Sequence, residues 1–194
     1  MKWTTFLIAA VLCLVFADRA QAQRRLPSQQ GIQLTAGMVN RFNTDNKSGG
    51  SHFHVGAAFS SYTKSGNYWL FGGEYLQKRY LYSNIRLPLA QFTGEGGYFL
   101  NFLSDGGKTV FFSLGVSAIA GYETINWNDK LLPDGATIQN KDTFLYGAAL
   151  TFETEIFLTD WAALLLNIRE RALFGSSVGK FNTQLGLGIR FIIN

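Results

Sequence analysis

The chain has 194 residues, of which 15% are charged and 15% aromatic, and its formal net charge is +4. Soluble domains usually carry about 25% charged residues. Low charge, together with 21 glycines and three prolines, favours a single all-β domain with one apolar face. The basic residues are scattered rather than clustered, so we expect no direct binding of nucleic acid.

Residues 1–22 are predicted to be a cleaved signal peptide, which leaves residues 23–194 as one domain. Lys2 gives a positive start, Trp3–Ala17 is apolar, and Ala20–Ala22 offers small residues at a cleavage site. The alternative is a membrane anchor, but this apolar stretch is shorter than the ~20 residues that span a bilayer as a helix. Cys13 is the one cysteine and lies in this segment, so we expect no disulfide or thiol chemistry in the mature chain.

Eight later segments alternate with the two-residue period of extended strands, whose successive side chains point to opposite faces. In chain order, the predicted strands are Gly31–Phe42, His52–Tyr62, Tyr68–Tyr82, Gln91–Leu103, Thr109–Ile125, Asp142–Phe157, Trp161–Phe174 and Lys180–Asn194. Nothing after residue 22 resembles a membrane-spanning helix. The chain therefore reads as strands joined one after another.

The expected connections alternate in length. Those after the first, third and fifth strands have about 9, 7 and 16 residues, and the others have about 3 to 5. The third connection is expected around Asn84 to Leu89, where Pro88 occurs. Outer-membrane barrels have an even number of strands, short periplasmic turns and longer outer loops. We therefore predict an eight-stranded antiparallel up-and-down transmembrane β-barrel of the outer-membrane type.

The distribution of small residues indicates which face of each strand points inward. The face that bears the charges also bears most of the glycines, whereas Phe, Leu, Ile, Tyr and Trp occupy the other face. Small residues suit the crowded interior of a narrow barrel, and a closed barrel leaves no unpaired strand edge in lipid. A soluble barrel would reverse these faces. We therefore expect the protein in the bacterial outer membrane, in contact with lipid.

Acidic and basic side chains are predicted to share the barrel interior, where they must pair or form hydrogen bonds. We expect an interior ion-pair network, and Glu153 and Glu155 are expected to neutralise Arg169 and Arg171 of the following strand. The alternative is a path that conducts protons or ions. The residues predicted to point inward are Glu74, Glu95, Glu123, Glu153, Glu155, Lys78, Arg41, Arg169, Arg171 and Arg190.

Only weak signals for chemistry occur in the sequence. His52 and His54 share one strand face, which could suit a metal, but no further ligands cluster near them in the sequence. A hydrolase would need a histidine beside a serine and a carboxylate. We expect the two histidines to be polar residues at the rim of their strand. The sequence therefore predicts no catalytic residue, cofactor, metal or small-molecule substrate.

Several segments resemble a known family of exported proteins. They are GIQLTAGMV (31–39), EYLQKRY (74–80), QFTGEGGYFLNFLSD (91–105), GYETINWNDKLLPDGATI (121–138) and RERALFGSSVGKFNTQLGLGIRFIIN (169–194). With the predicted signal peptide, they are similar to the TraO family of conjugative-transposon proteins from Bacteroides-type bacteria. The resemblance implies a component of a conjugal DNA-transfer apparatus, similar to type IV secretion, with other transfer proteins as partners. The family pattern implies no catalytic residue.

The longest predicted loop, 126–141, carries large apolar residues among polar ones. Trp127, Leu131 and Leu132 form a candidate contact surface for a partner protein. Two other functions stay open from the sequence: a barrel with lipid-modifying activity, and a passive stabilising or adhesive barrel unrelated to conjugation.

Overall fold

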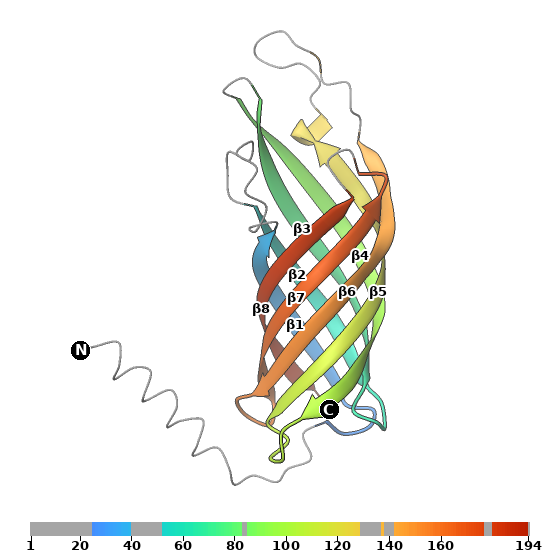
Figure 1. Cartoon of the computed structure of the whole chain (residues 1–194), viewed down its shortest axis with the longest axis vertical. Coiled ribbons are helices and arrows are strands. Elements are labelled where there is room, and N and C mark those ends of the chain that lie inside the picture. Colours follow the sequence, from blue (N-terminus) through green and yellow to red (C-terminus); the bar gives the residue numbers. More distant parts are fainter. Residues whose placement is uncertain are drawn as a thin grey trace, which may run out of the picture.

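The computed structural model describes residues 25–39, 52–82, 85–128, 137, 142–176 and 180–193. Eight strands form one closed barrel in which each strand pairs with the next and β8 pairs antiparallel with β1 (Figure 1). The predicted fold is therefore confirmed. The strands are β1 (Gln30–Val39), β2 (Phe53–Tyr62), β3 (Tyr68–Tyr82), β4 (Ile85–Ser104), β5 (Val110–Ile125), β6 (Thr143–Phe157), β7 (Ala162–Phe174) and β8 (Phe181–Ile193), and a short 3₁₀ turn, η1 (Asn126–Asn128), follows β5.

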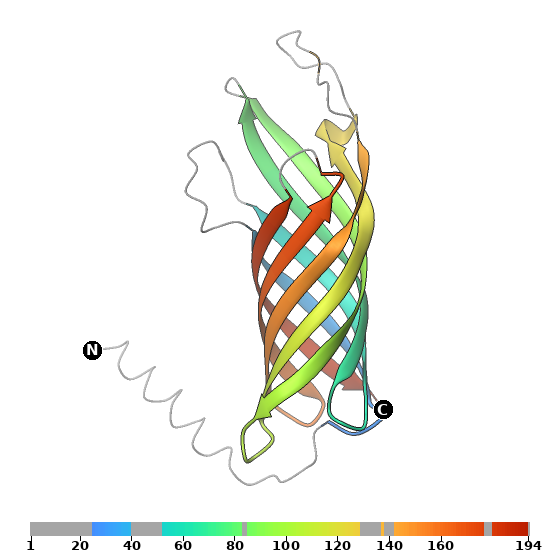
Figure 2. The same ribbon diagram turned by 45° about the vertical axis from the view of Figure 1, so that its right-hand side comes forward.

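The two ends of the barrel differ. The short connections β2–β3, β4–β5 and β6–β7 lie at the lower end in Figure 1, together with the start of β1 and the end of β8. We call this the short-turn end and the opposite end the long-loop end. At the long-loop end, β3 and β4 extend well beyond the neighbouring strands (Figure 2).

The predicted loop at residues 84–89 is wrong, because β4 begins at Ile85 rather than at Gln91. Pro88 pairs with Arg79 of β3, whereas the pairing of β4 with β5 begins only at Leu89. Pro88 therefore lies in a two-stranded extension made by β3 and β4. The other edge of β4 has no described strand beside it at this point. A proline is tolerated at such an edge because its missing N–H removes no ladder hydrogen bond.

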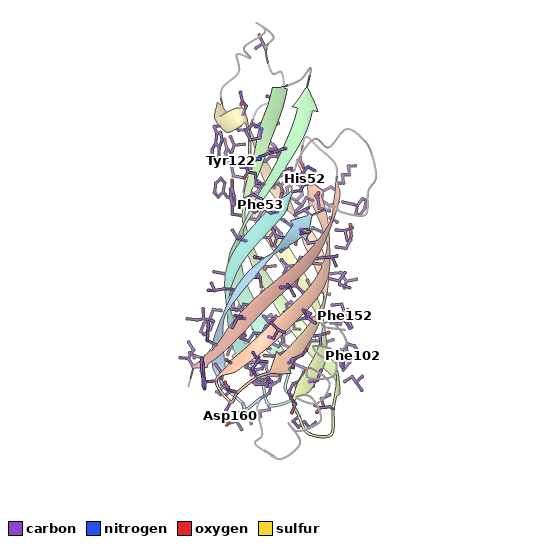
Figure 3. The ribbon with its side chains drawn as sticks, turned by 90° about the vertical axis from the view of Figure 1, so that its left-hand side faces the viewer. His52, Phe53, Phe102, Tyr122, Phe152 and Asp160 are labelled. Atoms are coloured by element: carbon purple, nitrogen blue, oxygen red, sulfur yellow. The ribbon has the colours of Figure 1, made fainter. Side chains whose placement is uncertain are left out.

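The outward face of the barrel is apolar along all eight strands. Val116, Tyr146, Phe174 and Leu187 are examples, and each is exposed. Aromatic side chains occur towards both ends, as at Tyr122 and Phe102 in Figure 3. Such a surface has the composition that hydrocarbon requires of a transmembrane barrel.

The interior is filled by side chains, as an eight-stranded barrel allows. Tyr62, Tyr68, Leu70 and Phe99 form one buried cluster, in which the rings of Tyr68 and Phe99 stack with centroids 4.7 Å apart. Opposite the Phe99 ring lies Gly115, where an added Cβ would come within 2.4 Å of that ring. The glycine thus makes room for the aromatic side chain.

No segment in the described ranges forms a helix that is long and apolar enough to span a membrane.

Candidate functional site

The charged residues inside the barrel form a network that runs between strands far apart in the chain. In the described part of the chain, each of its four guanidinium groups forms an ion pair with at least one of four carboxylates. We call this set the interior network. It consists of Arg25, Arg169, Arg171, Arg190, Glu74, Glu95, Glu153 and Glu155.

Arg190 of β8 is the centre of the network near the short-turn end. Its Nη2 lies 2.9 Å from Oε1 of Glu153, and its Nη1 lies 3.1 Å from Oε1 of Glu155. The guanidinium also donates to Gln33 and, at 2.9 Å, to the hydroxyl of Tyr62. Arg190 is fully buried, so these partners replace the water that a guanidinium loses on burial.

Arg25 precedes β1, yet its side chain is buried inside the short-turn end. Its Nε donates to Oε2 of Glu155 at 3.0 Å, and its Nη1 donates to the carbonyl of Gly66 at 3.0 Å. The guanidinium carbon also lies 4.2 Å from the ring centroid of Phe111, a cation–π distance. Burial is the largest single effect and would lower the pKa of Arg25, but Glu155, Tyr62 and Tyr68 together outweigh it, so this pKa is raised.

Glu74 and Arg169 join β3 to β7 across the middle of the barrel. Arg169 Nη1 lies 3.3 Å from Glu74 Oε2, and its Nη2 lies 2.8 Å from Glu95 Oε2. Arg171 Nη1 lies 2.6 Å from Glu74 Oε1, and the Gln184 amide donates to the same oxygen at 2.7 Å. Two acids and two bases thus balance one another in this layer.

A third polar layer lies nearer the long-loop end. Lys78 donates to the side-chain oxygen of Asn182. Glu123, which is fully buried, accepts hydrogen bonds from the Gln91 amide at 2.7 Å and from the Ser176 hydroxyl at 2.8 Å. Glu123 therefore points inward as predicted. The two hydrogen bonds just named are not ion pairs, because an amide and a hydroxyl donate them.

The sequence predicted which side chains point inward, but not which of them pair. Glu153 and Glu155 do not neutralise Arg169 and Arg171, because the register places Asn167 and Leu165 opposite them. Arg25 was not predicted as a member of the network, and Tyr62 and Gln33 were not predicted to bind it. Tyr62 and Gln33 occupy inward positions of β2 and β1, so alternation could have identified them. Arg41 lies outside the described residues.

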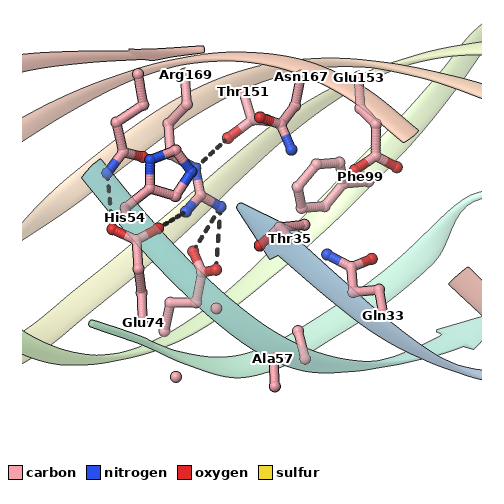
Figure 4. Close-up of a pocket in the computed structure, with 15 residues that line it drawn as sticks. Gln33, Thr35, His54, Ala57, Glu74, Phe99, Thr151, Glu153, Asn167 and Arg169 are labelled. Carbon is pink, nitrogen blue, oxygen red and sulfur yellow. Dashed lines mark hydrogen bonds and ion pairs between the residues drawn. The ribbon is translucent and has the colours of Figure 1, made fainter. Parts of the chain in front are cut away.

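A small polar cavity of about 20 Å³ lies in the barrel interior, lined by residues of every strand except β5 (Figure 4). This volume is enough for about one water molecule. His54, 3% exposed, lines the cavity beside Glu74 and Arg169, and its Nδ1 has no hydrogen-bond partner among the described residues. His54 is therefore an interior residue rather than a rim residue as expected.

The two histidines do not form a shared site. The ring of His52 approaches the backbone, with its Nε2 3.1 Å from the carbonyl oxygen of Arg79. The lining of the cavity at His54 includes Thr35 and Thr151 but no serine. Within the described ranges, no group of three or more His, Cys, Asp or Glu side chains is placed to hold a metal ion.

Trp127 follows β5 within η1 and is 60% exposed. Its backbone is left-handed, with φ 54° and ψ 35°, an uncommon conformation for a bulky residue. Such local strain persists where the surrounding structure holds it. Leu131 and Leu132, the other predicted contact residues, lie outside the described residues.

Comparison with solved structures shows the same architecture in exported bacterial barrels. The Neisserial surface protein A superimposes with a TM-score of 0.60 at 12% identity, over 84% of this chain and 96% of that one. The attachment invasion locus protein Ail of Yersinia pestis gives a TM-score of 0.55 at 7% identity, over 87% of this chain and all of that one. At these identities the likeness concerns the fold alone.

Comparison of the sequence identifies the family. A search of curated proteins gives no match. The family model described as "Conjugative transposon protein TraO" matches residues 26–193, nearly the whole chain, as the resemblance of its segments implied. The chain therefore belongs to the TraO family of conjugative transposon proteins.

Proposed function

We propose that this protein is a non-enzymatic structural component of the outer-membrane part of a conjugal DNA-transfer apparatus. Membership of the TraO family supports the link to conjugation. The closed barrel with an apolar outward face supports a place in the outer membrane. The residues of the long-loop end, Trp127 among them, then contact other transfer proteins.

The observation that carries the structural role is the filled interior. The interior network and the buried aromatic cluster occupy the lumen, and the central polar cavity holds only about 20 Å³. A lumen of this kind cannot pass a DNA strand. The protein therefore acts as an anchor or a stabilising part of the apparatus, and any channel for DNA is built by other components.

The same interior disfavours the enzyme, whereas an experiment has to separate the other alternative. A lipid-modifying enzyme would need a serine beside a histidine and a carboxylate, and the lining of the His54 cavity contains no serine. A barrel unrelated to conjugation would leave transfer unaffected when it is removed. These differences make the proposal testable in cells.

The test is an in-frame deletion in the donor cell, complemented by the wild-type gene or by an inward variant such as His54→Gln. We expect deletion to reduce transfer frequency at least about a hundredfold and the wild-type gene to restore it. His54→Gln should also restore transfer, because no step depends on its imidazole. Normal transfer after the deletion would exclude a role in the apparatus, and failure of a correctly inserted His54→Gln protein would favour an enzyme.

The place in the membrane needs a separate measurement. Fractionation of donor cells should recover the protein with the outer membrane, and the folded barrel should migrate differently from the heated one in SDS gels. Mild extraction of that fraction should then recover other transfer proteins with it. Recovery in the soluble fraction would contradict the proposed location.

A further inference from the structure

One acidic residue lies on the apolar outward face of the barrel. Glu170 of β7 alternates with the inward residues Arg169 and Arg171, so its side chain points outward among Ile168 and other apolar residues. On the adjacent β8, the register partner Thr183 donates its hydroxyl to Glu170 Oε2 at 2.6 Å. A carboxylate can accept about four hydrogen bonds, so this oxygen pair has capacity for further donors.

A groove of about 500 Å³ lies on the same outward surface, across β1, β6, β7 and β8. Ile168 and Leu185 line it, and each is two residues along its strand from Glu170 and Thr183, respectively. From there the groove continues towards the short-turn end along Leu166 and Leu187. The carboxyl–hydroxyl pair thus lies at the long-loop end of an apolar groove.

The depth of Glu170 in the membrane follows from its place in β7. It lies eight residues beyond Ala162, the first residue of the strand at the short-turn end. With a rise of about 3.3 Å per residue and a tilt of about 40°, this is about 20 Å along the barrel axis. Exposed Phe174 lies four residues further along β7, so Glu170 lies in the part of the apolar band, which is about 25 Å tall in such barrels, that is nearer the lipid headgroups of the long-loop side.

The lining of the groove is suited to a hydrocarbon chain. Leu166, Leu187 and Met38 supply apolar walls, and Ala36 contributes only a methyl group between them. Rows of outward residues are about 6 to 7 Å apart along a strand, so the path from Glu170 past Ile168 to Leu166 is about 13 Å long. A groove of this length, with an acid at its headgroup end, matches a molecule with a cationic head and an apolar tail.

We propose that Glu170 and Thr183 with this groove form a binding site for a lipid whose headgroup carries a primary ammonium group. The ammonium donates to the Glu170 carboxylate, and one acyl chain lies in the groove past Ile168 and Leu185. The charge of the acid selects the ammonium, because an ammonium–carboxylate hydrogen bond is stronger than a neutral one. An anionic headgroup is repelled by the same carboxylate. The site goes beyond the proposed function and rests only on its membrane placement.

The test uses the full-length protein, extracted from the outer-membrane fraction in a mild detergent. Native mass spectrometry measures binding of phosphatidylethanolamine and of phosphatidylglycerol with identical acyl chains. We expect about tenfold tighter binding of phosphatidylethanolamine, as the loss of one charge-assisted hydrogen bond would imply. Glu170→Gln keeps the shape and the bond from Thr183 but removes the charge, and it should abolish this preference.

A pair of matched variants tests the groove itself. Ala36→Phe fills the groove and should reduce binding of both lipids, whereas Ala120→Phe adds the same ring to an exposed outward position of β5 away from the groove and should change neither. A preference for phosphatidylethanolamine that survives Glu170→Gln would overturn the site. So would a dimer that forms in wild type and is lost in Ala36→Phe, because a second copy would then occupy the groove. If the protein is absent from the membrane fraction, the proposed location fails instead.

Discussion

Arg25 and Glu155 are 130 residues apart in the chain, yet the Nε of Arg25 donates to Oε2 of Glu155 at 3.0 Å inside the short-turn end of the barrel. The same carboxylate accepts a bond from Tyr62 at 2.8 Å through its other oxygen. The segment before β1 is therefore held by the barrel interior. Arg25 closes the short-turn end, and its contacts join β2, β5 and β6.

Replacing Arg25 should destabilise the barrel although the residue belongs to no strand. Arg25→Met removes one partner of a buried charge but leaves Arg190 3.1 Å from Glu155, so we expect a loss of about 2 to 4 kcal/mol in the free energy of unfolding. Urea unfolding of the refolded barrel in phospholipid vesicles measures it. Lys64→Met, at an exposed turn position, is the control and should change stability by less than about 0.5 kcal/mol. Equal effects would show that Arg25 contributes nothing specific.

The pair formed by Arg169 and Glu95 should show strong energetic coupling. Arg169→Met leaves both Glu95 and Glu74 without this cation, so it should lower the free energy of unfolding by about 3 to 5 kcal/mol. Glu95→Gln should cost less, because Glu74 still lies 3.3 Å from Arg169. The loss of unfolding free energy in the double variant should be about 1 to 3 kcal/mol smaller than the sum of the losses in the two single variants. Additive losses in a double-mutant cycle of unfolding measurements would contradict the contact at 2.8 Å.

Gly147 of β6 should not tolerate a side chain. A Cβ there would lie 2.0 Å from the backbone oxygen of Ala172 on β7, and backbone of a paired strand cannot move aside. Gly147→Ala should therefore lower the free energy of unfolding by at least about 1 to 3 kcal/mol. Gly94 on the outward face of β4 is the matched control, because its Cβ would meet nothing nearer than 3.9 Å. Gly94→Ala should be neutral or slightly stabilising, and a similar loss in both would argue against the steric cause.

Trp127 offers a test of the proposed contact surface that leaves the barrel intact. Trp127→Ala should reduce the transfer frequency of a complemented deletion donor at least about tenfold, because the proposed partner contact loses its largest apolar group. Trp161 is the control, since it is also 60% exposed but lies in the β6–β7 connection at the short-turn end. Trp161→Ala should leave transfer within about twofold of wild type. Heat-modifiable migration in gels confirms that both variants fold, and equal transfer by both would exclude Trp127 as a contact.

The alternation of side chains could be predicted from the sequence because it is a local property of extended backbone. It identified the inward positions of Glu74, Glu123 and Arg190, and the outward positions of residues such as Phe181. Glu170 has the same outward phase, because it alternates with Arg169 and Arg171 along β7. The strand around Pro88 was missed because a proline is tolerated there only since β5 ends before it and leaves that edge of β4 unpaired. No local sequence pattern shows where the neighbouring strand ends.

The sequence by itself therefore determined the architecture: eight alternating strands, a small and charged inner face, and an apolar outer face. Only the tertiary structure decided which charges meet. The closure of β8 on β1 and the register of each strand pair place Arg190 beside Glu153 and Arg169 beside Glu95. The tertiary structure also brings Arg25 to Glu155, although Arg25 lies in a segment that lacks the two-residue alternation of a strand. Such pairs depend on distances across the barrel, and these exist only once the sheet has closed on itself.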